Sequence, residues 1–238
     1  TYPIRNEAFA LEGKRSEWRR ELNIPEDRFT VVLSDGGYGM AKLEATVTEL
    51  VKHKAEITIF AVCGKNAEGA ERLKKLKCAE GIDLRVFGFT DKMLEFLCAA
   101  DLYVGKSGAN SIAEPTFFGL PVILTKCITP IEVGTKKYFK DIIGNALFIR
   151  SPKKAAEKIA YFATHRAELK TLAENTKKRR AAYGAEQIAD LLYERAVHAC
   201  AASAAADGGT EGKTGEVSEQ LAAEAAVADG VAAQEDKN

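Results

Sequence analysis

The sequence predicts an α/β domain built on a doubly wound parallel sheet, and three observations lead to this fold class. Short runs rich in Val, Ile, Leu and Phe alternate with helix-length amphipathic stretches from Phe29 onward, which is typical of strand–helix–strand units. The strand runs are apolar on both faces, as expected where helices cover both sides of a sheet. Loops rich in glycine and small residues follow several strands, at the positions where such sheets bind ligands.

Six strands and the helices between them account for most of residues 29–150. We place the strands at 30–34, 56–62, 84–89, 102–106, 122–125 and 146–150. The helices between them are expected near 40–53, 67–79, 92–100, 111–118 and 133–143, and most follow a residue that favours a helix start. A short helix over 16–22 precedes the first strand. Beyond the sixth strand, Ser151 and Pro152 begin a helical periodicity that reaches about Cys200, with a break at Gly184.

The formal net charge of zero conceals two parts of opposite charge. Residues 201–238 hold eight acidic and two basic residues, a charge of −6, so residues 1–200 carry +6. The segment 201–238 is rich in Ala and Glu and has no aromatic residue, so it cannot bury enough apolar surface to offset its ordering entropy. We therefore expect an entry segment (1–28), one α/β domain with C-terminal helices (29–200) and a disordered acidic tail (201–238).

Composition and motifs exclude several classes of protein. The chain has no apolar run of membrane-spanning length and no apolar signal core, so we expect a cytoplasmic protein. The five cysteines lie far apart without a C-x-x-C pair, which indicates reduced, buried thiols. No Gly-Lys-Ser/Thr triplet follows Gly39, which argues against a P-loop NTPase, and no carboxylate ends the second strand, which argues against a nicotinamide dehydrogenase. The histidines lie outside the motif loops and are interpreted as surface or helix-end residues.

Two loops after predicted strands carry the candidate chemistry. The first loop, 34–40, places Gly36, Gly37 and Gly39 at a strand-to-helix turn, where backbone N–H groups bind an anion such as phosphate; a tight turn explains these glycines equally well. The second loop, 105–114, puts small residues at a helix start and Glu114 about one turn into the helix. A carboxylate suits a vicinal diol because it accepts two hydrogen bonds at once, but a helix dipole also favours an acid there.

Five segments of the chain form a set of motifs in a fixed order and spacing. They are Gly36–Met40, Gly88–Met93, Ala100–Gly108, Ile112–Glu114 and Gly119–Leu124. As a set they resemble the C-terminal half of the GT-B glycosyltransferases, a Rossmann-like domain. The most similar group contains the monogalactosyldiacylglycerol synthases and the processive diacylglycerol glucosyltransferases, which are glycosyltransferase family 28-like. The resemblance runs from about residue 2 to about residue 195, and Tyr2-Pro3-Ile4-Arg5 looks like the segment that joins the two domains of these enzymes.

The resemblance implies an enzyme that transfers a hexose from a UDP-sugar to a lipid acceptor such as diacylglycerol, in glycolipid biosynthesis. No cofactor and no metal are implied, because fixed dipoles of the GT-B cleft stabilise the departing diphosphate. Residues 29–200 would form the nucleotide-sugar-binding domain, and residues 1–28 the interdomain linker and entry helix. The basic run 177–180 fits peripheral contact with an anionic membrane on the cytoplasmic face or a solvated helix face; nucleic acid is not indicated.

The resemblance also implies contacts between the donor and four loops. The diphosphate would meet two sets of residues, which are Gly36, Gly37, Gly39 and Met40 in the glycine loop and Ser107, Gly108, Ala109, Asn110 and Ser111 in the next. Phe89 and Thr90 would hold the uracil through backbone groups. Glu114 would bind the ribose hydroxyls, and Glu132 would lie at the donor sugar. No catalytic residue is assigned, because the family's N-terminal domain supplies the base.

Departures from the family pattern leave the donor hexose and the activity of the chain open. Ile131 stands where the group has a glutamine, Asn110 replaces a glycine, and Pro115 replaces an alanine. The chain begins at Thr1 and lacks the N-terminal acceptor domain, so we expect a fragment or a split subunit. The alternative function is a non-catalytic or split nucleotide-sugar-binding subunit that needs a separate acceptor-domain partner, and a sugar-nucleotide epimerase is weaker.

Overall fold

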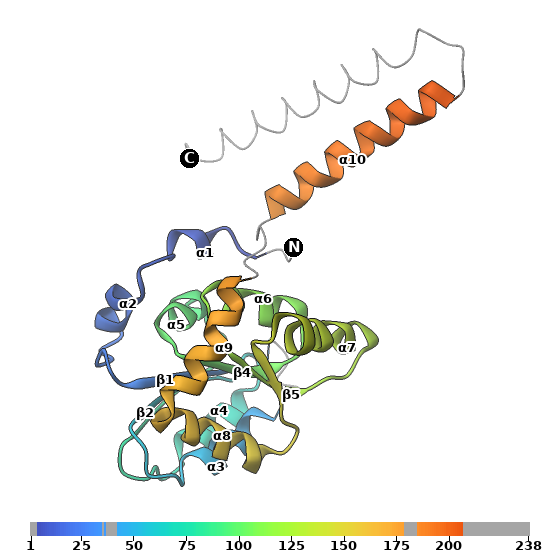
Figure 1. The fold of residues 1–238 in the computed structure, drawn as a ribbon. Helices are drawn as coiled ribbons and strands as arrows, with labels where there is room; N and C mark the ends of the chain where they lie inside the picture. Colours follow the sequence, from blue (N-terminus) through green and yellow to red (C-terminus); the bar gives the residue numbers. More distant parts are fainter. Residues whose placement is uncertain (1–3, 35, 37–41, 179–184, 207–238) are drawn as a thin grey trace. The chain divides into compact units, whose positions relative to one another are not determined.

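A six-stranded parallel sheet forms the centre of the fold (Figure 1). The computed structural model describes residues 4–34, 36, 42–178 and 185–206. Across the sheet the order is β3-β2-β1-β4-β5-β6, and every neighbouring pair is parallel. The predicted doubly wound, Rossmann-like sheet is therefore confirmed. Its strands are β1 (Phe29–Ser34), β2 (Ile57–Val62), β3 (Ile82–Phe87), β4 (Leu102–Lys106), β5 (Val122–Lys126) and β6 (Ala146–Phe148).

The direction in which the sheet grows reverses between β1 and β4. From β1 the chain adds β2 and β3 on one side, and it then returns to the other side of β1 to add β4, β5 and β6. Because all the strands are parallel, their carboxyl ends lie along one edge, and the reversal opens a crevice between the loops that follow β1 and β4. The register sets Ser34 beside Gly105 at this crevice.

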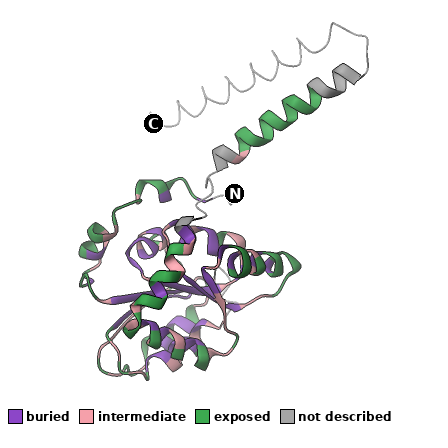
Figure 2. Cartoon of the chain, viewed as in Figure 1, coloured by how far each residue is buried: buried purple, intermediate pink, exposed green. Residues whose placement is uncertain are grey.

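Helices cover both faces of the sheet and enclose two apolar cores. One core joins Val31 and Leu33 of β1 to α3, α4 and α8, and the other joins Val32 to α5, α6 and η1, because successive strand residues point to opposite faces. Figure 2 shows the strands mainly buried and the outer faces of the helices exposed. The helices are α1 (Glu7–Ala10), α2 (Arg15–Glu21), α3 (Leu43–Leu50), α4 (Ala67–Lys74), α5 (Met93–Ala99), α6 (Ala109–Phe117), α7 (Pro130–Lys137), the π-helix η1 (Tyr138–Ile143), α8 (Pro152–Thr164), α9 (Arg166–Lys178) and α10 (Ala185–Ala206).

Several element boundaries differ from the expectation by a few residues, and two of the differences matter for the local structure. Strand β3 ends at Phe87 rather than at residue 89, so Phe89 lies in the loop that follows. Helix α8 ends at Thr164 and α9 begins at Arg166. This break at His165 was not predicted, because neither glycine nor proline marks it. The N-cap role of Ser151 is confirmed, since its side chain accepts a hydrogen bond from the backbone of Lys154; Gly184 lies outside the described residues.

Contacts within the chain separate two units, Thr1–Ala185 and Glu186–Asn238. Helix α10 lies in the second unit apart from its first residue, and the predicted boundary between residues 200 and 201 falls within this helix. Residues 207–238, which form most of the predicted acidic tail, lie outside the described residues. Among the residues that are described, no helix is both long and apolar enough to cross a membrane.

The cysteines are only partly buried. Cys63 and Cys98 are buried, Cys127 is intermediate, and Cys78 and Cys200 are exposed. The expectation of buried thiols is therefore wrong for the last two. Burial raises the pKa of the Cys98 thiol to about 11, so this side chain behaves as a small apolar residue at neutral pH.

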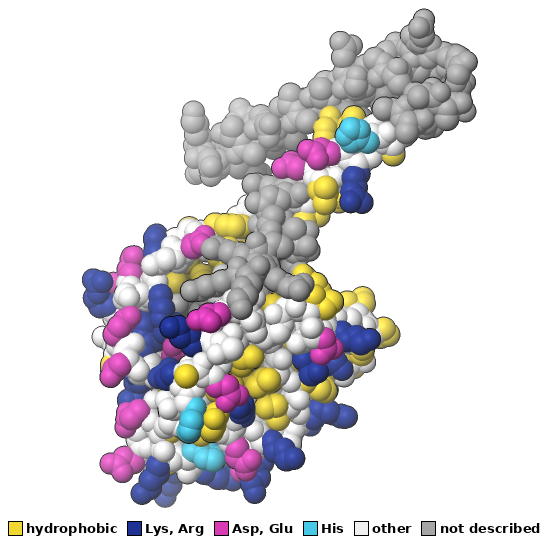
Figure 3. Space-filling view, viewed as in Figure 1, with side chains coloured by type: hydrophobic (Ala, Val, Ile, Leu, Met, Phe, Trp, Pro, Cys, Tyr) yellow, Lys and Arg dark blue, Asp and Glu magenta, His cyan; other side chains and the backbone are white. Residues whose placement is uncertain are grey.

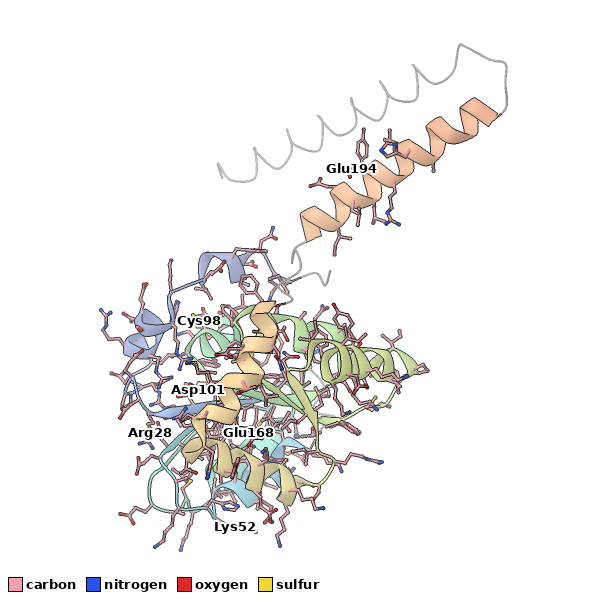
Figure 4. The ribbon with its side chains drawn as sticks, in the orientation of Figure 1. Arg28, Lys52, Cys98, Asp101, Glu168 and Glu194 are labelled. Atoms are coloured by element: carbon pink, nitrogen blue, oxygen red, sulfur yellow. The ribbon has the colours of Figure 1, made fainter. Side chains whose placement is uncertain are left out.

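A buried arginine fixes the N-terminal segment to the sheet. The side chain of Arg19 in α2 is fully buried and donates hydrogen bonds to the carbonyl oxygens of Ala99, at 2.7 Å, and Pro25, at 2.6 Å. Asp101, labelled beside α9 in Figure 4, lies 3.8 Å from Arg19 and accepts a hydrogen bond from the backbone of Thr30 at 2.8 Å. Burial lowers the pKa of the Arg19 guanidinium, and Asp101 offsets part of that effect.

Replacing Arg19 by glutamine is expected to lower the free energy of unfolding by about 3 kcal/mol, because buried carbonyl groups lose a charged donor. Arg20→Gln is the matched control, since Arg20 is exposed on the same helix, and it should change the free energy by less than about 0.5 kcal/mol. Urea unfolding measures both values. Equal effects of the two substitutions would contradict the anchoring role of Arg19.

Candidate functional site

A pocket of about 340 Å³ lies at the carboxyl edge of the sheet, in the crevice between β1 and β4. Four of the residues predicted from the sequence line it, namely Gly36, Asn110, Ser111 and Glu114. A larger and more open hollow of about 870 Å³ lies beside β6 and α8 and contains none of the predicted residues. The smaller pocket is the candidate site, because it occupies the position at which doubly wound sheets bind ligands.

The loop after β1 enters the pocket at Gly36. The backbone of Gly36 has a φ of +70°, a left-handed conformation that glycine adopts without strain, and its N–H donates to the Ser34 hydroxyl at 3.2 Å. A Cβ atom at this position would lie 3.3 Å from Cε of Lys106. Gly36 therefore lets the first loop approach the end of β4 closely. The other predicted residues of this loop, Gly37, Gly39 and Met40, lie outside the described residues.

The loop after β4 leads directly into helix α6. Ser107 is buried and its hydroxyl donates to the Lys126 carbonyl at 2.7 Å, so this side chain ties the loop to β5. Gly108 is the N-cap residue, and α6 begins at Ala109. The first N–H groups of a helix have no intrahelical acceptor. The start of α6, which includes Asn110 and Ser111 of the pocket wall, therefore offers backbone donors to an anion at the carboxyl edge.

Glu114 lines the pocket one turn further along α6 and forms a two-bond ion pair. Arg5 donates from Nε to one carboxylate oxygen of Glu114 at 2.7 Å and from a terminal nitrogen to the other at 3.0 Å. This hydrogen bonding is the main cause that raises the pKa of Arg5 above its ordinary value. Ile4 packs with Ala113 and Phe117 of α6. The segment before α1 is thus fixed to the helix that carries the predicted ribose-binding carboxylate.

Pro115 changes the hydrogen bonding of α6 next to the pocket. It lies inside the helix and has no N–H, so it cannot donate to the carbonyl of Ser111 as a helical residue would. Both residues line the pocket. Because proline stands at position 115 where the family has alanine, the helix lacks the N–H that would normally bond to the Ser111 carbonyl. Ser111 lies at the pocket wall.

Glu132 stabilises the start of α7. Its N–H donates to the Thr129 hydroxyl at 3.2 Å, and one of its carboxylate oxygens accepts from the Thr129 N–H at 3.4 Å, which together form a capping box. The same oxygen also accepts from the Ile128 N–H at 2.6 Å. The other carboxylate oxygen lies 3.2 Å from Nζ of Lys106. Burial acts to raise the pKa of Glu132, but the hydrogen bonds from Ile128 and Lys106 outweigh it, and the pKa lies below the ordinary glutamate value.

The residues around Glu132 differ sharply in exposure. Ile131 is 77% exposed and Val133 is 45% exposed, whereas Glu132 is only 7% exposed. Figure 3 shows hydrophobic and lysine side chains mixed over the surface in the region of α7. Ile131 therefore points into open space, where its side chain offers no hydrogen bond to a sugar.

Two predicted residues of the loop after β3, Phe89 and Thr90, do not line the pocket. Phe89 is 76% exposed, and the hydroxyl of Thr90 accepts a hydrogen bond from the Lys92 N–H at 3.1 Å. Strand β3 is the outermost strand on its side, two positions from β1. The structure therefore brings together residues of the β1 and β4 loops but does not bring these two residues to them.

Sequence reasoning missed two charged residues of this region. Arg5 belongs to the predicted interdomain segment, and it pairs with Glu114, 109 positions away. Lys106 belongs to one of the family-like motifs, and it pairs with Glu132 across 26 positions. The signal available in the sequence was the position of Lys106 at the end of a strand, directly before a loop of small residues.

The strand order and the pocket at its reversal are those of a doubly wound, Rossmann-like α/β domain. Residues 30–133 match the model of the glycosyltransferase family 28 C-terminal domain. The chain is 32% identical to monogalactosyldiacylglycerol synthase 1 of Arabidopsis thaliana over 73% of its length and 33% of that protein. It is 30% identical to the spinach (Spinacia oleracea) monogalactosyldiacylglycerol synthase over 74% of its length and 35% of that protein.

A solved structure shares the same fold. The crystal structure of MurG from Acinetobacter baumannii superposes with a TM-score of 0.61 at 19% sequence identity, over 77% of this chain and 54% of that one. The predicted resemblance to one half of a GT-B glycosyltransferase is therefore confirmed. The chain spans about a third of the length of the two plant proteins.

Proposed function

We propose that the chain is the donor-binding half of a hexosyltransferase that moves a sugar from a UDP-sugar to a lipid acceptor such as diacylglycerol. The observation that carries this proposal is the pocket between β1 and β4, which Gly36, Asn110, Ser111 and Glu114 line together. A UDP-sugar requires an anion site next to a diol site. The start of α6 supplies donors for the diphosphate, and Glu114, one turn further on, supplies an acceptor for the ribose hydroxyls.

The electrostatics of this edge support a diphosphate as the ligand. The diphosphate is the leaving group of a glycosyl transfer, so negative charge grows on it as the bond to the sugar breaks. Helix N-terminal N–H groups and a nearby ammonium group stabilise such charge without having to reorganise. Lys106 ends β4 next to Gly108, with Nζ 3.5 Å from the Cβ position of that glycine, and supplies the ammonium group.

The nature of the sugar and of the acceptor is inferred from the relatives. Both plant relatives are monogalactosyldiacylglycerol synthases by name, so galactose is the first hexose to test and diacylglycerol the first acceptor. A lipid acceptor would place the active protein at a membrane surface, with this domain in peripheral contact. The acceptor site would come from residues beyond the matched third of the relatives, in the same polypeptide or in a partner subunit.

Calorimetric titration with UDP tests the nucleotide site. We expect wild-type protein to bind UDP and Glu114→Ala to weaken binding by about 10-fold or more, because a charged acceptor for the ribose hydroxyls is lost. Glu80→Ala is the matched control, since Glu80 is exposed and precedes β3 at the opposite edge of the sheet. Absence of binding at millimolar UDP, or equal affinities for the wild type and Glu114→Ala, would contradict the assignment.

Release of UDP from UDP-galactose in the presence of diacylglycerol vesicles tests the enzymatic role. The chain by itself should release UDP no faster than a blank, and addition of an acceptor-binding domain from a plant relative should produce lipid-dependent release. UDP-glucose serves as the competing donor. Full activity of the chain alone would contradict its role as half of an enzyme, and binding of UDP without turnover in any combination would favour a non-catalytic subunit.

A further inference from the structure

Lys106 occupies a central position at the carboxyl edge, among three loops. Its Cε lies 3.3 Å from the point that a Cβ atom would occupy at Gly36, in the loop after β1. Its Nζ lies 3.5 Å from the Cβ position of Gly108 at the start of α6 and 3.2 Å from a carboxylate oxygen of Glu132 at the start of α7. The ammonium group is therefore close to both loops that the diphosphate would meet, while an acidic residue of a third loop holds it.

The two carboxylate oxygens of Glu132 have different hydrogen-bond partners. One oxygen accepts the N–H groups of Ile128 and Thr129, at 2.6 and 3.4 Å, and thereby caps α7. The other oxygen contacts Lys106. The capping oxygen is needed for the local structure, so only the oxygen that faces Lys106 is available to exchange partners.

Of the two paired side chains, that of Lys106 is the more accessible to solvent. The side chain of Lys106 is 31% exposed, and that of Glu132 is 9% exposed. An anion that approaches the edge therefore reaches the ammonium group before it reaches the carboxylate. Charge-assisted bonds to a diphosphate, which has more charge and more acceptor oxygens than a carboxylate, compete well for a lysine in this position.

We propose that Lys106 is a diphosphate-binding residue that Glu132 holds through their ion pair and releases when the donor binds. On binding, the ammonium group moves from Glu132 to the diphosphate, and the released carboxylate oxygen accepts a hydroxyl of the donor sugar. The inference rests on the proposed function and deepens it. It gives Glu132 a role at the sugar that the neighbouring Ile131, with its apolar and 77% exposed side chain, cannot fill.

Comparing the binding of UDP and uridine tests the role of Lys106. Lys106→Met should weaken UDP binding by about 10-fold or more and leave uridine affinity within about 2-fold, because only UDP carries phosphates. Lys106→Arg should retain most of the UDP affinity. Lys137→Met removes an exposed lysine of α7 and serves as the matched control, with no change for either ligand.

Glu132→Gln tests the release step. Glutamine keeps the capping box, which thermal unfolding checks, but it no longer competes for the ammonium group. UDP affinity should therefore rise several-fold, while the preference for UDP-galactose over UDP should fall, because the single oxygen of the amide caps α7 and the NH2 group that then faces the sugar cannot accept a hydroxyl. In the double variant with Lys106→Met, the rise in UDP affinity should disappear, which would support the coupling of the two residues.

The outcomes separate this inference from the proposed function. If wild-type protein binds UDP and Lys106→Met binds it equally well, the diphosphate role of Lys106 is wrong while the nucleotide site stands. If Glu132→Gln weakens UDP binding as much as Lys106→Met does, the pair is purely structural and the release step is wrong. If the wild type binds neither UDP nor uridine, the proposed function is overturned together with the inference.

Discussion

The reversal of strand order between β1 and β4 is the constraint on which the candidate site depends. Parallel pairing on both sides of β1 forces the chain to return past the first strand, so the loops that follow β1 and β4 open beside one another. The two strands approach so closely there that a Cβ at Gly105 would lie 2.8 Å from the Ser34 carbonyl oxygen and 2.6 Å from the Tyr103 hydroxyl. A larger residue at position 105 would therefore disturb the floor of the pocket.

Ion pairs then connect this edge to more distant parts of the sequence. Glu114 holds Arg5 of the N-terminal segment, and Glu132 holds Lys106 of β4. At the start of the sheet, Asp101 receives the Thr30 N–H and lies near Arg19. The segment before β1 is consequently attached at two places. Arg19 joins it to Asp101, and Arg5 joins it to Glu114 in the pocket. Any motion of that segment relative to α6 would act directly on Glu114.

The strands could be predicted because burial on both faces leaves runs of Val, Ile, Leu and Phe that few other structures produce. The pocket residues Gly36, Asn110, Ser111 and Glu114 could be predicted because they follow strands and start a helix. The partners of Glu114 and Glu132 could not, because pairs separated by 109 and 26 positions leave no local pattern. The hydrogen bond from the Ser107 hydroxyl to β5 could not be predicted either. A serine in a loop has the same sequence context whether its hydroxyl contacts a ligand or a neighbouring strand.

The predicted contact of Phe89 and Thr90 with uracil depends on the loop after β3, and neither residue lines the pocket.

The proposed function requires that the nucleotide binds at the carboxyl edge between β1 and β4. Mapping amide chemical shifts in a ¹⁵N-labelled sample during a UDP titration tests it most directly. Binding at this edge should produce the largest changes at Gly36, Gly108, Ala109 and Ser111. Changes concentrated in residues 148–161 beside β6, with the carboxyl edge unaffected, would contradict it.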